Sequence, residues 1–337
     1  MENRTLTKKT AAIYFAVIFL LNKILSAISD VIVMSRFDGI FEDMADSAIA
    51  SYYSSTLMSV GSFIVNIITI ASIIIAGKKL TGSKTGTIRF LGCYYFGAAV
   101  GTLFSSLISN VFQYLMAFFI PASTGSTIIT VSSILCLVPA ILAASMAFTA
   151  FEELNDKIPA HPLNVALSKA RITFVITFII SAVVSGVVSS LPSLLRALIN
   201  PEPDTFVSDA LIFSGYLAKW LANVIVFAVV YIAGYITTKS HYGAINFYLP
   251  ASAFSVPVTA VIGNISSVIV NALKYSDMLK VAQSGETDYL SSTMYSSYIG
   301  YVSIVSTVLT LIVSFAICFK AFSMFYKKKT ESDPVEQ

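Results

Sequence analysis

The chain has 337 residues, of which 56% are hydrophobic and 12% are charged, and its formal net charge is only +3. A soluble domain has about 25% charged residues, so this composition excludes an ordinary water-soluble fold, and the weak net charge gives no reason to expect nucleic acid as a partner. We expect the lipid bilayer to surround a single transmembrane domain that takes up residues 1–337.

A basic segment, MENRTLTKKT, begins the chain and is followed by an apolar run over residues 11–33. This run is too long for a cleavable signal sequence, and it lacks the small residues of a cleavage site. We therefore predict that it is retained as the first membrane-spanning helix.

Apolar runs long enough to cross a bilayer recur along the whole chain. At about 1.5 Å per residue, each covers a hydrocarbon core of about 30 Å, and a helix satisfies its own backbone hydrogen bonds in lipid. The sequence therefore predicts an all-α, polytopic membrane bundle. Its eight spans are expected at residues 11–33, 57–76, 90–111, 128–150, 172–191, 211–236, 250–271 and 298–320.

The basic residues are distributed unevenly between alternate loops. The N-terminus, every second loop and the C-terminal tail hold 15 of the 21 Lys and Arg residues, the other loops hold four, and two lie within spans. Because basic loops stay in the cytoplasm, we predict a multi-pass protein of the plasma membrane with both termini inside. Residues 327–337 would form a cytoplasmic tail beside the anionic headgroups.

Similar Ser-containing segments close the four outward-going spans. They are LSAISDVI from Leu25, SSLISNVF from Ser105, SSLPSLLR from Ser189 and SSVIVNAL from Ser266. We interpret them as marks of four similar helical hairpins, with residues 11–150 and 171–320 as possible duplicated halves. The alternative is that Ser is simply common at the outer ends of these helices.

The segments that follow these outer ends carry apolar residues at helical spacing. This spacing predicts short helices that lie along the outer interface. They are expected within residues 39–53, 112–120, 194–199 and 272–282.

The first span contains a polar stripe. At 100° per residue, one arc of about 120° holds all five of its polar residues: Asn22, Lys23, Ser26, Ser29 and Asp30. A charge at the bilayer centre costs at least about 2.5–3.5 kcal/mol, so we expect the stripe to face protein or water. It is either a lined pathway, a site for an ion or polar headgroup, or a satisfied contact between helices. A pathway predicts that Lys23→Ala abolishes activity.

Further polar or helix-breaking residues lie in later spans. Lys219 and Asn223 lie on the sixth span, and Lys219 is expected to extend to the outer headgroups with Trp220 as an interface anchor. Pro257 lies in the seventh span, where it removes a backbone donor near Asn264, and broken helices of this kind often border transporter sites.

Small residues four apart predict close helix packing at two places. These are Gly97 to Gly101 and Ala182 to Gly186, and such faces allow two helix backbones to approach each other. Cys93, Cys136 and Cys318 lie in apolar runs, so we predict neither a disulfide framework nor a metal site, and no cofactor.

The cytoplasmic segment FEELNDK contains two adjacent glutamates, Glu152 and Glu153, and a basic residue, Lys157, four positions after the second. This short motif resembles the paired-glutamate motif of the CAAX-protease and bacteriocin-processing family of intramembrane proteases. In that family, further helices supply histidines. Here the histidines are His161 and His241, neither lies within a predicted span, and the Phe that the family places four residues before a histidine is missing.

Three functions are compatible with the sequence. The first is transport: a permease or flippase-like protein, or the membrane subunit of a multicomponent transporter. A cytoplasmic ATPase or a second copy of the chain is then a possible partner, with Glu152, Glu153, Lys157, Lys169 and Arg171 as docking candidates. The second is a non-catalytic scaffold, accessory or immunity protein, and the third is the protease activity that the glutamate motif implies. The sequence favours a protein that is not an enzyme.

Overall fold

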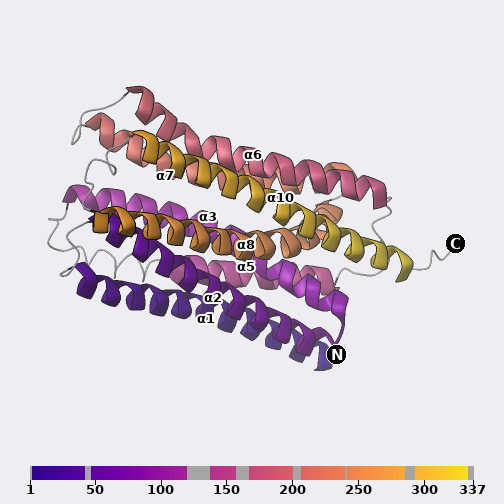
Figure 1. The fold of residues 1–337 in the computed structure, drawn as a ribbon. Helices are drawn as coiled ribbons and strands as arrows, with labels where there is room; N and C mark the ends of the chain where they lie inside the picture. Colours follow the sequence, from indigo (N-terminus) through magenta and orange to yellow (C-terminus); the bar gives the residue numbers. More distant parts are fainter. Residues whose placement is uncertain are drawn as a thin grey trace. The chain divides into compact units, whose positions relative to one another are not determined.

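The computed structural model describes residues 2–41, 47–119, 137–156, 167–199, 206–239, 241–284 and 293–332. Within these ranges the chain is almost entirely α-helical. The helices are α1 (Glu2–Phe41), α2 (Ser47–Thr81), α3 (Lys84–Phe119), α5 (Leu137–Asp156), α6 (Leu167–Ile199), α7 (Phe206–Thr238), α8 (His241–Ser284) and α10 (Thr293–Ser332) (Figure 1).

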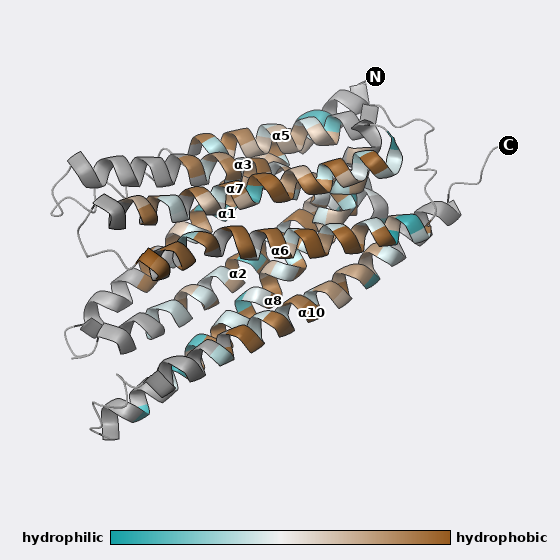
Figure 2. Cartoon of the chain, turned by 90° about the horizontal axis from the view of Figure 1, so that it is seen from above, coloured by the Kyte–Doolittle hydropathy of each residue, from teal (hydrophilic) through white to brown (hydrophobic). Residues whose placement is uncertain are grey.

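Six of these helices are long and apolar enough to cross a membrane, by length and composition. The candidate segments are Lys8–Val33, Tyr53–Thr81, Leu167–Val188, Phe213–Thr238, Phe247–Ser276 and Ile304–Ser323. Figure 2 shows one of them clearly, since the middle of α6 is brown, and therefore hydrophobic, along most of its length. The structure thus supports a multi-pass membrane protein, while the count of eight spans stays a prediction. Only Val138–Glu152 of the fourth predicted span forms a described apolar helix, and it is shorter than the six.

The turn between α2 and α3 shows how the sequence sets one helix boundary. Gly82 has a φ of +63°, a left-handed conformation that glycine adopts without a side-chain clash, and its N–H donates to the Lys78 carbonyl at 2.9 Å. Ser83 then caps the next helix, because its hydroxyl accepts the N–H of Gly86 at 2.9 Å. Lys78 and Lys79 lie in the last turn of α2, where the helix dipole favours positive charge.

The chain forms two compact units. The first comprises Met1–Phe19, Ala76–Ala253 and Ala321–Gln337, and the second comprises Leu20–Ile75 and Phe254–Lys320. Four helices, α1, α2, α8 and α10, therefore contribute segments to both units.

Aromatic side chains form much of the core of the first unit. The Phe15 ring stacks on Phe90 with their centroids 4.3 Å apart, and Phe151 packs edge-on against both rings. Phe174 stacks on Phe322 at 4.6 Å. These large rings are almost fully buried, so they hold the ends of α1, α3 and α5, and of α6 and α10, together.

Two helix pairs in the first unit approach closely through glycine. A methyl group at Gly97 would overlap the backbone carbonyl oxygen of Ala143 on α5, and one at Gly101 would lie 2.6 Å from the Ala143 Cβ. At Gly234 of α7, an added Cβ would lie 3.0 Å from the Ala244 backbone of α8. The predicted packing face from Gly97 to Gly101 is therefore confirmed. For Ala182 to Gly186 close packing stays a prediction, because no described atom lies within 4 Å of a Cβ at Gly186.

Hydrogen bonds and rings join the segments of the second unit. The hydroxyls of Ser266 on α8 and Ser306 on α10 are hydrogen-bonded to each other. Cys318 donates its S–H to the Phe254 carbonyl at 3.4 Å, so α8 and α10 run antiparallel here. Tyr53 on α2 and Tyr275 on α8 have their ring centroids 5.5 Å apart.

The predicted short interfacial helices are not separate elements where the structure describes them. Residues 112–119, 194–199 and 272–282 are the last turns of α3, α6 and α8. No glycine stands at the junctions between these segments and the preceding spans, and a helix elongates cooperatively once it is formed. Even Pro192 lies inside α6 without ending it. Part of the first predicted segment, residues 42–46, lies outside the described residues.

Candidate functional site: a polar cavity between α1 and α2

Two matching polar stripes face each other in the second unit. Asn22, Ser26 and Ser29 follow the spacing i, i+4, i+7 on α1, and Ser62, Asn66 and Thr69 follow the same spacing on α2. Residues at this spacing share one face of a helix. The helices run antiparallel, because Asn22 meets Thr69 at one end, and Ser29 meets Gly61 at the other.

One hydrogen bond closes the first of these two ends. The Asn22 Nδ2 atom donates to the Thr69 Oγ1 atom at 2.9 Å, and Thr69 is only 4% exposed. This bond uses one of the two N–H groups of the amide, so the second N–H and the Asn22 Oδ1 atom stay available. The bond thus fixes the orientation in which Asn22 presents them.

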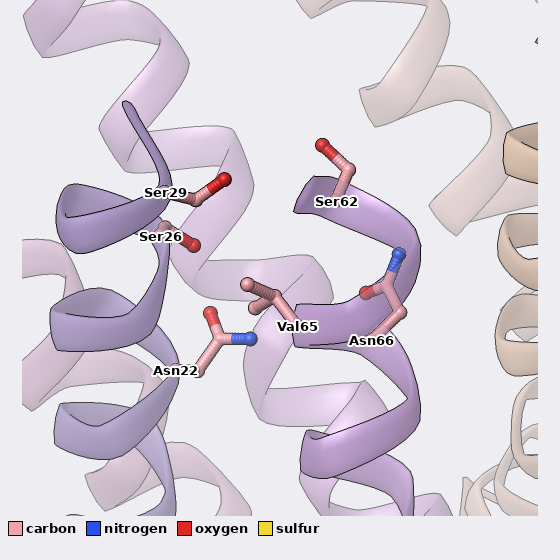
Figure 3. A pocket seen from close by; sticks show the side chains of 6 residues that line it. All are labelled: Asn22, Ser26, Ser29, Ser62, Val65 and Asn66. Atoms are coloured by element: carbon pink, nitrogen blue, oxygen red, sulfur yellow. The ribbon is translucent and has the colours of Figure 1, made fainter. Parts of the chain in front are cut away.

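Between this bond and the contact of Ser29 with Gly61, the two stripes enclose a cavity of about 180 Å³. Figure 3 shows the side chains that line it, with the Ser26 and Ser29 hydroxyls directed from α1 toward α2. The lining residues are Asn22, Ser26, Ser29, Ser62, Val65 and Asn66. Val65 is buried, Ser62 is exposed, and the others are half-buried, so the cavity is open on one side.

The polar lining groups are unlike many hydroxyls of the helices. Ser59 and Thr81, for example, donate to the backbone carbonyls of Ser55 and Gly77 in their own helix. Within the described part of the chain, Ser26, Ser29 and Ser62 show no such bond, and neither does the Asn66 amide. Their hydrogen-bonding capacity is therefore free for a ligand or for water.

One end of the cavity, at Asn22 and Asn66, lies near the middle of two apolar segments, and the cavity extends from there toward Ser29 and Ser62. The segment Lys8–Val33 has its midpoint between Leu20 and Leu21, and the segment Tyr53–Thr81 has its midpoint at Ile67. Asn22 and Asn66 each lie within about 3 Å of these midpoints along the helix axis. Polar side chains at such a depth are rare and mark functional sites in membrane proteins.

The structure separates Lys23 from the neutral members of the predicted stripe. Lys23 is exposed and does not line the cavity. Asp30 lies on α1, seven residues after Lys23 and therefore on the same side of the helix. The predicted arc is thus divided into a neutral face against α2 and a charged edge.

The other predicted pathway residues lie on α7 and α8, and none of them is among the residues that line this cavity. Asn223 is exposed and Pro257 is buried. The Asn264 Nδ2 atom is buried and has no hydrogen-bond partner among the described residues. Lys219 lies in α7, and its half-buried neighbour Trp220 follows it.

Two of the docking candidates are bound within the first unit. Glu152 forms an ion pair with the Lys8 ammonium at 2.9 Å, and the Arg171 Nε atom donates to Ser323 at 3.0 Å. Lys169 is exposed. Glu153 lies in the last turns of α5, whereas Lys157 lies outside the described residues.

The sequence-based predictions did not include the α2 side of the cavity. Ser62, Asn66 and Thr69 occur in SFIVNIIT, where isoleucine and valine hide the polar positions from a hydropathy average. The i, i+4, i+7 spacing was the signal, and the angular projection applied to the first span would have found it. No group of three or more His, Cys, Asp or Glu side chains suited to a metal occurs in the part of the chain that the structure describes.

Comparisons with known proteins give no family for this chain. A scan against protein-family models has no match, and neither the curated proteins nor the solved structures contain a match.

Proposed function

We propose that the protein is a transport-type membrane protein, of the permease or flippase kind, in which the cavity between α1 and α2 receives the polar group of a substrate. The observation that carries this proposal is an open, neutral, hydrogen-bonding cavity at mid-depth of two apolar helices. Binding sites of secondary transporters typically lie near the bilayer midplane.

The free-energy cost of unpaired polar groups favours a cavity that holds a polar occupant. Unpaired hydroxyl and amide groups in an apolar medium cost about 1–3 kcal/mol each by mutational measurements. Four such side chains, Ser26, Ser29, Ser62 and Asn66, line one cavity. A sequence selected for stability alone would place apolar residues here, so a polar occupant, water or substrate, explains the pattern better.

The orientation belongs to the same proposal. We place both termini in the cytoplasm of the plasma membrane, with eight spans in four hairpins, because the basic residues gather at alternate loops. An ATPase or a second copy of the chain would dock on the cytoplasmic side, where Lys169 is exposed.

A reconstitution experiment tests the transport function. The full chain is placed in liposomes with trace lipids that carry an NBD-labelled acyl chain and either a phosphocholine or a glucose headgroup, and dithionite is added outside. Transport predicts that quenching proceeds beyond the outer-leaflet fraction, and that Asn22→Leu with Asn66→Leu slows this phase at least tenfold.

Two controls accompany this experiment. Protein-free liposomes give the outer-leaflet fraction alone. The Ala71→Leu variant introduces the same leucine side chain at an exposed position of α2 that does not line the cavity, so it should translocate lipid at the wild-type rate. Quenching of the wild-type proteoliposomes that stops at the outer leaflet for both lipids contradicts the proposal.

The scaffold function has one observation in its favour. The bond between Asn22 and Thr69 is a satisfied contact between helices, and such bonds contribute about 0.6 kcal/mol on average in membranes. A scaffold predicts that the cavity variants lower thermal stability while the wild-type protein moves neither lipid.

A further inference from the structure

We infer that the cavity between α1 and α2 holds the uncharged, hydroxyl-bearing headgroup of a lipid, such as a glycerol or a sugar. This inference rests on the proposed function and names its substrate class. It follows from the charge, the hydrogen-bonding character, the size and the surroundings of the cavity.

Among the residues whose side chains the structure describes, the lining carries no formal charge. These residues are two asparagines, three serines and one valine, and Lys23 stands outside the lining. Removing an ionised group from water is costly unless an opposite charge or a full ligand shell compensates it. A cavity with one open side and no counter-charge therefore favours a neutral group over a phosphate or an ammonium.

The lining also offers both donors and acceptors. Each serine hydroxyl can donate one hydrogen bond and accept two, and the Asn66 amide does both. The Asn22 amide contributes its oxygen and one N–H, because its other N–H is bound to Thr69. Hydroxyl groups, which also donate and accept, are the simplest complement to such a mixed surface.

The volume of the cavity fits one polar group of a ligand, such as a headgroup, rather than a whole drug-sized molecule. About 180 Å³ is far more than one water requires, which is about 10–15 Å³ by the same kind of measure. It is less than the roughly 300–1,000 Å³ of a pocket for a drug-sized ligand. A headgroup fits this range if the rest of the molecule lies outside the cavity.

The surroundings provide a place for that remainder. On the same two helices, the faces turned away from the lining expose large apolar side chains: Ile24 and Ile28 on α1, and Ile64 and Ile68 on α2. Both helices would therefore face lipid on these sides, and acyl chains attached to the headgroup would leave the cavity through its open side into that lipid. A free sugar or glycerol would gain nothing from contact with lipid.

Binding to the purified full-length chain tests this inference without any transport measurement. Native mass spectrometry compares three lipids with identical acyl chains: glucosyl-diacylglycerol, phosphatidylcholine and phosphatidic acid. We expect glucosyl-diacylglycerol to bind at least about fivefold more tightly than the other two, which corresponds to about 1 kcal/mol. An excess of methyl glucoside should not displace it.

Variants connect the preference to the cavity. Asn66→Leu should remove the preference for the glucosyl lipid, whereas Ala71→Leu, about 140° around α2 from Asn66, should keep it. If Asn66→Leu does not fold, as judged by gel filtration and thermal melting, Ser62→Val makes the same test at the exposed rim.

The outcomes are distinct from those of the transport assay. Equal binding of the three lipids, tighter binding of phosphatidic acid, or an unchanged preference in the cavity variants overturns the inference. Displacement by methyl glucoside overturns the requirement for a lipid. A retained glucosyl preference in a protein that moves no lipid overturns only the proposed transport function.

Discussion

At the scale of single residues, the neutral and charged members of the α1 stripe have different roles. Asn22, Ser26 and Ser29 line the cavity, and Asn22 is fixed by its bond to Thr69. Lys23 is exposed and lies to one side. Its ammonium could therefore contact a bound group only from the rim of the cavity and not from inside it.

This division gives a prediction for Lys23→Ala. We expect the variant to keep a substantial part of the lipid translocation rate, and to lose less than Asn66→Leu, because none of the lining groups changes. Dithionite quenching of NBD lipids in matched proteoliposomes measures both rates. Loss of lipid translocation in Lys23→Ala, together with a normal rate in Asn66→Leu, would show that the substrate passes along the charged side of α1 and not through the cavity.

The cavity could be predicted only in part from the sequence. The helical projection placed Asn22, Ser26 and Ser29 on one face, and in the structure these three residues line one cavity. The projection also included Lys23, because an arc of 120° is wider than the contact between two helices. Which neighbouring helix completes a site depends on tertiary packing, so the α2 residues could be found by their spacing but not paired with α1.

At the scale of helices, small residues four apart predict close helix packing correctly at one place, while at another the described residues show no such contact. Gly97 and Gly101 pack against α5, whereas Gly186 faces open space among the described residues. Both segments have small residues four apart, but a small residue only permits close approach. A partner helix must also be present on that side, and the sequence does not state this.

Alanine substitutions turn this difference into a prediction. Gly97→Ala should destabilise the protein by about 1–3 kcal/mol, as overpacking usually does, because the new methyl group meets the rigid Ala143 backbone. Gly186→Ala should be neutral or stabilising by up to about 1 kcal/mol, since alanine is the better helix former. Thermal unfolding of the two variants in the same detergent measures both. Equal melting temperatures would show that α3 and α5 do not pack as described.

Aromatic packing and ion pairing at the same helix ends contribute unequal amounts. Phe90 is fully buried and contacts the rings of Phe15 and Phe151. The nearby pair of Lys8 and Glu152 is about one-third exposed, with side-chain values of 29% and 38%. Exposed ion pairs contribute little because water and salt screen them.

We therefore expect Phe90→Ala to cost about 3–5 kcal/mol, and Lys8→Ala to cost no more than about 1 kcal/mol. Equilibrium unfolding by denaturant in mixed micelles compares the two variants, and added salt should weaken the wild-type protein only slightly. A larger loss in Lys8→Ala would mean that the pair is shielded from water, for example by a partner chain at this end.

At the scale of the whole molecule, α3 decides the number of spans. Its segment from Phe90 to Val100 is largely buried, including Phe90, Leu91, Cys93 and Tyr94. A helix that other helices shield from lipid does not need an apolar surface on every side. Its mean hydropathy is therefore a poor guide to whether it crosses the membrane. The antiparallel packing of α3 on α5 fits two helices that cross together.

The position of residues 120–127 separates the two topologies. With eight spans this segment is outside the cell, whereas with only the six apolar segments it stays in the cytoplasm, because α3 and α5 then do not cross. Lys84 and Arg89 at the start of α3 favour a cytoplasmic N-terminal end. At about 1.5 Å per residue, α3 is long enough to reach the other side. We therefore expect the eight-span topology.

Cysteine labelling on intact cells measures this position. In a background with the native cysteines replaced, Ser126→Cys should react with a membrane-impermeant maleimide without permeabilisation, as Asp204→Cys should in either topology. Ser83→Cys, in the turn after α2, should react only after permeabilisation. Both termini lie on the same side with six or eight spans, so a terminal tag cannot replace this measurement. Labelling of Ser126→Cys only in permeabilised cells would establish six crossings, and it would make α3 and α5 a helical pair on the cytoplasmic side.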